Sequence, residues 1–295
     1  MKLSCLKNSL IIVFTLSIFV CKNGLSQQQT FDSLKALLKT TSVPKERATL
    51  LVDIAKSIYI NSPDSSIGYC QQAEELSKKY NLDVQLAFSL HCECRYLILK
   101  GDIKNSIEKL NKAISIFEKN KEFIGLAKAY SLKAVALGKL HKNKEQIDYL
   151  NKSKSIYLKA NDTSGISNVL TNLAHAYIES HQYLFALKAL EEHEKLKIPK
   201  NGNEFFVEVQ YGNIYYHLNQ MEEAIIHFKK CVQVANQYKM LDSEITGLTH
   251  LAECYQKQKN IPEAKSYYFQ ALDLAKQNRL ILEEADALKG MTDLY

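Results

Sequence analysis

The sequence predicts an all-α protein, an α-solenoid of stacked helix–turn–helix hairpins. Six hairpins are complete, and the first helix of a seventh follows them. Three observations carry this prediction: amphipathic stretches of helical period, small residues that recur every 38 to 40 residues, and polar turns between the stretches. We expect the four prolines and ten glycines to lie mostly at the turns, and no stretch shows the alternation of a strand.

The clearest hairpin spans Ile245 to Asn278. Its first helix carries Ala252 and Tyr255 on one face, and its second helix carries Ala264 and Tyr268 on one face. Two helices approach closely only where side chains are short, and the rings fill the remaining volume. Because one such hairpin cannot bury its own apolar face, it needs neighbouring copies.

The neighbouring copies lie at a nearly constant distance along the chain. Each has a small residue that is followed three positions later by a ring or a large aliphatic side chain. Such regular spacing is the sequence signature of a repeat protein. In chain order, these small residues are Ala55, Cys94, Ala134, Ala174, Gly212, Ala252 and Thr292.

The pattern L-[AG]-x2-Y … A-x3-[YF]-x2-A resembles the tetratricopeptide repeat, and it covers nearly all of Lys45 to Tyr295. The copies around Gly212 and Ala252 fit best, and the copy around Ala134 departs most. The resemblance implies a right-handed solenoid whose first helices line a concave groove. The period is longer than the basic unit of the family and is similar to that of the lengthened repeats of bacterial signalling and scaffold proteins.

The first 26 residues are predicted to be a signal peptide, because Lys2 and Lys7 precede the apolar run from Leu10 to Val20. The protein is therefore expected to be exported to the periplasm or the cell exterior. Lipid anchoring at Cys21 is the less favoured alternative. The predicted boundaries are 1–26 for the signal peptide, 27–43 for a short capping helix and 44–295 for the solenoid, with hairpins at 44–81, 82–121, 122–161, 162–200, 201–240, 241–280 and a partial one at 281–295.

The charge balance argues against a nucleic-acid partner. The formal net charge of +6 falls to about +3 once the lysines of the signal segment are removed. The densest basic region, Lys139 to Lys159, is interrupted by Glu145 and Asp148 and has no aromatic stacking platform. We interpret it as a solvated outer face.

Five cysteines follow the signal segment, an odd number for an exported protein. Cys94 and Cys231 stand where the repeat needs a small apolar residue, so burial is the simplest interpretation. A disulfide between Cys231 and Cys254 is geometrically conceivable, but sequence alone does not decide it.

No catalytic or cofactor-binding motif was found, and we expect neither enzymatic activity nor a cofactor. The sequence has no phosphate-binding glycine loop, no His-Glu-x-x-His and no nucleophile elbow. His91 and Cys94 lack the second ligand pair of a structural zinc site, so no metal is expected either. No small-molecule substrate is evident.

The family resemblance indicates which side chains face the groove. In each first helix, the residue after the small one and the residue three before it are expected to point inward, joined by rings from adjacent turns. The candidate partner-binding residues are Lys56, Tyr59, His91, Arg95, Val135, Thr171, His175, Phe206, Asn213, Tyr216 and Glu253.

The predicted function is a non-catalytic scaffold that binds a partner protein or peptide in this groove. The alternative is an extracytoplasmic sensory region of a signalling protein, because exported arrays of this kind resemble the input regions of bacterial sensor kinases and repeat-bearing transcriptional regulators. The last helix, from Ile281, has no second helix after it. It is expected either to mediate self-association or to continue into an output domain.

Overall fold

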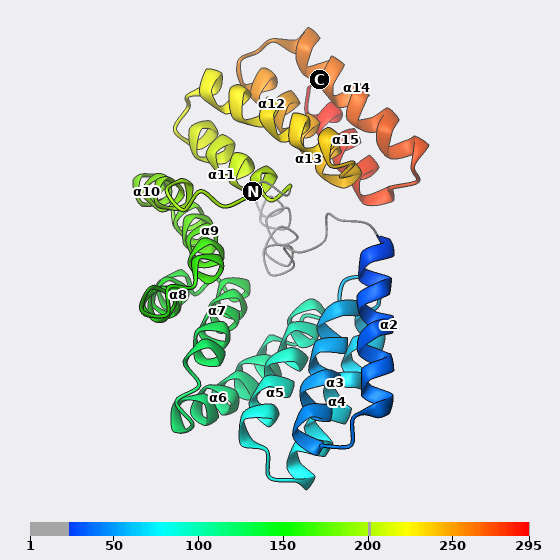
Figure 1. Cartoon of the computed structure of the whole chain (residues 1–295). Coiled ribbons are helices and arrows are strands. Elements are labelled where there is room, and N and C mark those ends of the chain that lie inside the picture. The colour runs from blue at the N-terminus through cyan, green and yellow to red at the C-terminus, as the bar shows by residue number, and fades with distance from the viewer. Residues whose placement is uncertain (1–23, 200–201, 295) are drawn as a thin grey trace. The chain divides into compact units, whose positions relative to one another are not determined.

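The computed structural model describes residues 24–199 and 202–294, and all fourteen regular elements in these ranges are α-helices (Figure 1). Most of the predicted signal peptide, residues 1–23, lies outside the described residues. The helices are α2 (Gly24–Thr40), α3 (Pro44–Ile58), α4 (Pro63–Lys79), α5 (Asp83–Leu99), α6 (Ile103–Lys119), α7 (Phe123–Lys139), α8 (Asn143–Lys159), α9 (Thr163–Glu179), α10 (Tyr183–Glu194), α11 (Glu204–His217), α12 (Met221–Gln237), α13 (Leu241–Lys257), α14 (Ile261–Gln277) and α15 (Ile281–Thr292).

The helices pair as consecutive hairpins, from α3–α4 to α13–α14, and α15 follows as an additional first helix. The predicted fold class is confirmed. Tertiary contacts divide the chain into two compact units, Met1–Ala176 (unit 1) and Tyr177–Tyr295 (unit 2). None of the described helices is both long enough and apolar enough to cross a membrane.

The small residues of the repeat lie where two helices meet. Five of them are 0% exposed: Ala55, Cys94, Ala134, Ala174 and Ala252. At the fifth position in chain order, a Cβ atom added to Gly212 would lie 2.5 Å from the ring of Phe228 on α12. Because protein interiors are close-packed, side chains larger than these would force the helices apart. The structure thus confirms the prediction that these recurring small residues mark close contacts between helices.

The hairpin turns repeat one backbone motif with different residues. After α6, Lys121 adopts a left-handed conformation with φ 56°, and the N–H of Glu122 donates to the carbonyl of Phe117. After α13, Lys259 is the left-handed residue, and the N–H of Asn260 donates to the carbonyl of Tyr255. This bond from C″ to C3 is the Schellman helix end, at which glycine is the usual left-handed residue. After α5, the left-handed residue is a glycine, Gly101.

In unit 1, α2 covers the first hairpin. The guanidinium group of Arg47, on α3, donates to the carbonyl oxygens of Leu38 and Thr41 at 2.8 and 2.7 Å. These bonds satisfy carbonyls at the end of α2 that have no partner within the helix. The ring of Phe31 packs edge-on against Tyr69 of α4. The N-terminal helix is therefore tied to both helices of the hairpin.

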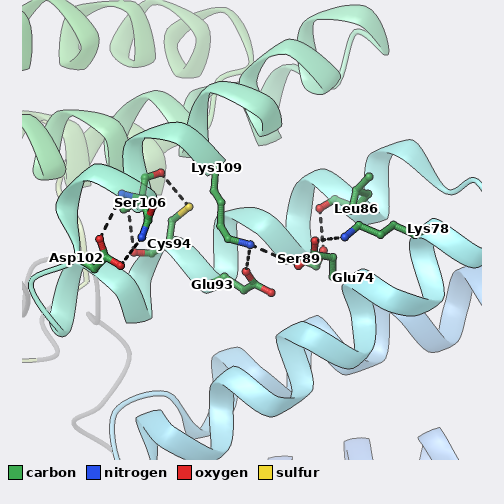
Figure 2. Close-up of polar contacts among 10 residues, drawn as sticks. Glu74, Lys78, Leu86, Ser89, Glu93, Cys94, Asp102, Ser106 and Lys109 are labelled. Atoms are coloured by element: carbon green, nitrogen blue, oxygen red, sulfur yellow. Dashed lines mark hydrogen bonds and ion pairs between the residues drawn. The ribbon is translucent and has the colours of Figure 1, made fainter.

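A polar network joins α4, α5 and α6 inside unit 1 (Figure 2). Lys109 of α6 lies 2.5 Å from a carboxylate oxygen of Glu93 on α5 and 3.6 Å from Glu74 on α4. Lys78 approaches Glu74 to 2.6 Å. Glu93 is only 4% exposed. Burial and a hydrogen bond with Glu74 raise the pKa of Glu93 to about 7, although Lys109 acts in the opposite direction.

In unit 2, rings and imidazoles fill the interfaces between helices. His227 of α12 pairs with Glu208 of α11 at 2.6 Å and stacks on Tyr211 at 4.9 Å between ring centroids. Phe228 stacks on His250 of α13 at 4.8 Å. These contacts link α12 to the first helices on both of its sides, which is how stacked hairpins cover one another.

The five cysteines among the described residues are all buried and free. The conceivable disulfide between Cys231 and Cys254 is therefore not formed. The thiol of Cys231 is directed toward α11, where it donates to the carbonyl of Phe205 at 3.8 Å. Cys231 thus fills a small-residue position, as the repeat pattern predicts.

Two glycine-to-alanine substitutions in unit 1 are expected to have opposite effects. At Gly125, a Cβ atom would lie 2.6 Å from the ring of Phe117, which is fully buried and has no room to move. Gly125→Ala should lower the free energy of unfolding by about 1 to 3 kcal/mol. At Gly68, within α4, a Cβ atom meets nothing within 4 Å. Gly68→Ala should raise the free energy by about 0.5 to 1 kcal/mol. Urea denaturation followed by circular dichroism measures both, and a shift of equal sign would contradict the packing described here.

The contribution of Glu93 to the stability of unit 1 is expected to fall as the pH rises from about 4.5 to about 7, whereas the buried neutral His91 makes the stability rise with pH up to about 6.5. The folded protein retains the proton of Glu93 up to about pH 7, whereas the unfolded chain releases it near the ordinary value of 4.5. At Glu93 the folded state therefore binds more protons in this window, and this contribution to the stability is lost as the pH rises through the folded pKa. Glu93→Gln should remove this contribution, so that the variant gains stability relative to the wild type as the pH rises, by about 1 to 2 kcal/mol at pH 8.

The matched control is Glu108→Gln, which changes an exposed carboxylate on α6. Urea midpoints at pH 5.5, 7 and 8 for the three proteins provide the measurement. A Glu93→Gln protein with the same pH slope as the wild type would show that Glu93 is not the group that titrates.

Candidate functional site: the first-helix face

In each unit, one surface is built from the first helices of successive hairpins. Helices α3, α5 and α7 contact one another in unit 1, and α11, α13 and α15 do so in unit 2, more closely than successive second helices do. A stack whose elements approach more closely on one side curves toward that side. We call this surface the first-helix face of each unit.

A tyrosine and an arginine connect the first two helices of this face in unit 1. The hydroxyl of Tyr59 on α3 donates to the backbone carbonyl of Arg95 on α5 at 3.1 Å. The guanidinium carbon of Arg95 lies 4.2 Å from the centroid of the Tyr59 ring. This cation–π contact restricts the position of the guanidinium group beside the ring.

Two lysines complete a group of positive charges around His91. Lys56 of α3 is exposed, pairs with Asp53 at 2.9 Å and lies 5.8 Å from the ring centroid of Phe88. Lys128 of α7 is also exposed, and its backbone forms a hydrogen bond with the His91 ring. The sequence analysis missed Lys128. It considered only two positions in each first helix, the residue after the small residue of the repeat and the residue three before it, whereas Lys128 lies six residues before Ala134. We call Lys56, Arg95 and Lys128 the cationic cluster.

The pKa values show that these charges act on one another. Burial, together with the charges of Arg95, Lys56 and Lys128, lowers the pKa of His91 to about 3, so its imidazole is neutral at physiological pH. Partial desolvation of the amine and repulsion from Lys56 lower the pKa of Lys128, against the attraction of Asp162, Asp53 and Glu122. A bound anion beside Lys128 would relieve that repulsion.

The other three candidate binding residues of unit 1 do not belong to the cationic cluster. Val135 is buried in the core with Leu132 and Phe117. Thr171 is also buried, and its hydroxyl donates to the carbonyls of Ser167 and Asn168. These two side chains are buried and offer no surface to a partner. His175, one turn after Thr171, is half-buried.

In unit 2 the first-helix face is mixed in charge. Phe206 is half-buried and packs edge-on against Phe205, and Asn213 is half-buried on the same helix. The amine of Lys257 lies 4.2 Å from the ring centroid of Tyr216 and donates to the Tyr216 carbonyl at 2.9 Å. Glu253 is half-buried 3.0 Å from His250.

Tyr216 and Lys257 repeat the arrangement of Tyr59 and Arg95. In both cases the tyrosine stands four residues after the small residue of its copy, and the cation comes from the next first helix. Lys257 was missed by the sequence analysis. A search for a tyrosine at this offset with a basic residue in the following copy would have found both pairs. In the described part of the chain, no three His, Cys, Asp or Glu side chains converge as metal ligands would.

Comparisons with known proteins agree with this architecture. A family model described as the tetratricopeptide repeat matches residues 205–277. The uncharacterized protein ycf37 of Porphyra purpurea is 30% identical over 135 residues, which are 45% of this chain and 72% of the relative.

Two solved structures are similar in fold. A Rap protein complexed with competence and sporulation factor has a TM-score of 0.65 at 18% identity, covering 85% of this chain and 71% of that one. NprR in complex with its cognate peptide NprX has a TM-score of 0.63 at 16% identity, covering 96% of this chain and 83% of that one. Together with the repeat pattern and the stacked hairpins, these similarities establish that the chain belongs to the tetratricopeptide repeat family.

Proposed function

We propose that this protein is an interaction scaffold that binds a negatively charged segment of a partner protein or peptide on the first-helix face of unit 1. The observation that carries the proposal is the cationic cluster. Lys56, Arg95 and Lys128 come from three successive first helices and surround one neutral histidine. Three cations on one continuous face suit a ligand with several carboxylates along its length.

The cluster is partly preorganised for such a ligand. Arg95 is held against Tyr59, so its guanidinium group loses little conformational freedom on binding. Lys128 is partly desolvated and repelled by Lys56, so a carboxylate placed between them gains more than it would beside an isolated surface lysine. On binding, Lys56 would give up its exposed ion pair with Asp53 and pair with the ligand instead. The loss is small, because exposed ion pairs contribute little stability.

The similar structures support the ligand class. NprR is described with a peptide bound, and the Rap protein is described with competence and sporulation factor bound. At their low identity to this chain they indicate a shared fold, so the ligand proposed here is argued from the cationic cluster itself. A sensory role for the protein would use the same face, with a peptide as the signal.

The triple variant Lys56→Ala/Arg95→Ala/Lys128→Ala tests this proposal. The probes are peptides selected by the purified wild-type chain from an array of random 15-residue sequences. The selected peptides are expected to be acidic, and the triple variant should weaken their binding by about 3- to 150-fold, because each exposed charge pair contributes roughly 0.2 to 1 kcal/mol. Fluorescence anisotropy at 50 and 300 mM salt measures the affinity, which should fall with salt.

The control variant Lys104→Ala/Lys112→Ala removes two exposed lysines of α6 in the same unit. Its affinity should equal that of the wild type. If both variants lose affinity equally, net charge and not the cluster attracts the peptides. If the selected peptides carry no excess of acidic residues, the proposal is wrong.

We propose further that the protein is exported and that residues 1–26 are removed. The support is the order of the N-terminal residues, with Lys2 and Lys7 before the apolar run from Leu10 to Val20. Expression of the full sequence in a Gram-negative host should give a periplasmic protein that begins at Gln27. Intact-mass spectrometry of the periplasmic fraction measures this. A chain that keeps residue 1 and stays in the cytoplasmic fraction would contradict the proposal.

A further inference from the structure

Two cysteines from neighbouring hairpins meet inside unit 1. Cys70 lies on α4, the second helix of the first hairpin, and Cys92 lies on α5, the first helix of the second hairpin. Their exposed fractions are 1% and 2%, and both belong to one hydrophobic core cluster with Ala55 of α3 and Ala73 of α4. The pair is separate from the binding residues proposed above.

The two thiols contact each other directly. The thiol of Cys70 donates a hydrogen bond to the sulfur of Cys92. A disulfide needs the two β-carbons about 3.5 to 4.5 Å apart, and sulfur atoms that already share a hydrogen bond reach bonding distance through small rotations of the side chains. The thiols of Cys94 and Cys231, by contrast, donate to backbone carbonyls of α6 and α11.

The surroundings of Cys92 make it the more reactive of the two thiols. The hydrogen bond from Cys70 and the positive charges of Arg95 and Lys56 lower the pKa of Cys92, against the effects of burial and of Glu93. The same hydrogen bond and burial raise the pKa of Cys70. Because a thiolate and not a thiol attacks a disulfide, Cys92 is the attacking group, and Cys70 keeps its proton until the second step.

We propose that Cys70 and Cys92 form a disulfide that joins the first two hairpins of unit 1, with a second disulfide, on an oxidoreductase or a small molecule, as the oxidant. The Cys92 thiolate attacks one sulfur of the oxidant, and the other sulfur leaves as a thiolate. Cys70 then loses its proton and attacks the Cys92 sulfur of the mixed disulfide, which releases the second thiolate. Two protein thiols are oxidised to one disulfide, and the oxidant is reduced to two thiols that take up the two protons.

The exchange precedes the complete stacking of the two hairpins, because both side chains are buried in the folded protein. Cys70 and Cys92 are 22 positions apart, so the bond closes a short loop that contains the turn between α4 and α5. The export proposed above would bring the chain into an oxidising compartment. The experiment below supplies the oxidant directly, so its outcome does not depend on export.

Refolding in a redox buffer tests the proposal. The full chain carries Cys5→Ser/Cys21→Ser, which removes the two cysteines of the predicted signal segment. It is reduced in urea and diluted into a buffer of oxidised and reduced glutathione. The intact mass of the folded product is expected to fall by two hydrogen atoms. A non-reduced tryptic digest should contain residues 57–78 joined to residues 80–95.

Three further substitutions identify the two sulfur atoms, because Cys92 and Cys94 lie in the same tryptic peptide. Cys70→Ala and Cys92→Ala should each abolish the cross-link. The matched control is Cys94→Ala, which changes a buried cysteine two positions along α5 and should retain it. Circular dichroism verifies that all variants are folded.

The cross-linked chain should also be the more stable form. Its melting temperature is expected to exceed that of the same chain in dithiothreitol by about 5 to 10 °C, because a closed loop restricts the unfolded chain. Cys92→Ala should melt at one temperature with and without dithiothreitol.

Three results would overturn the proposal. One is a chain that refolds in the redox buffer with all five remaining thiols free. Another is a cross-link that persists in Cys92→Ala, which would mean that a different cysteine is the partner. The third is a cross-linked chain that melts no higher than its reduced form, which would mean that the bond disturbs the packing of α4 against α5.

Discussion

The structure depends on the close approach of helix backbones at one small residue in each repeat. Where a Cβ atom would meet a ring at 2.5 Å, as at Gly212, the helix axes are set by the side chain of a neighbouring helix. Helix separation is therefore fixed by the smallest residue in the contact and by the ring opposite it. The contact is repeated in every hairpin, so each hairpin obtains its hydrophobic cover from its neighbours.

This constraint decides which side chains remain available for binding. Successive first helices touch, so a residue at their contact, such as Val135 on α7, is buried. Only side chains that reach past the contact remain at the surface, and they are long: Lys56, Arg95 and Lys128 in unit 1, Tyr216 and Lys257 in unit 2. Their positions are in turn fixed by rings from the neighbouring helix, as Tyr59 fixes Arg95.

The sequence predicted the part of the structure that is periodic. Small residues and rings recur at a fixed distance, and their burial follows from packing alone. It did not predict Lys128 or the Glu93–Lys109 network, because each depends on how far one hairpin is rotated against the next. The sequence also did not indicate most helix ends. In the described part of the chain, nine helices are followed two positions later by a non-glycine residue with positive φ, for example Lys121 and Lys259, whereas only the end of α5 has the expected glycine, Gly101. Burial of Thr171 was missed because threonine is common on surfaces as well.

A stack of hairpins allows one helix to serve two surfaces independently. Helix α7 carries Lys128 on one side and, on the opposite side, Leu126 and Tyr130, which line a hollow together with Lys152 and Ile156 of α8; the core side chains Leu132 and Val135 lie on the Lys128 side of the helix. Charge changes at either surface leave the core contacts intact, because the cations of both surfaces lie outside the core. The electrostatic effect of one surface on the other is weakened further by solvent, which screens exposed charges over about 10 Å. Charge changes at the two surfaces should therefore be nearly additive, since sites with no shared partners couple weakly.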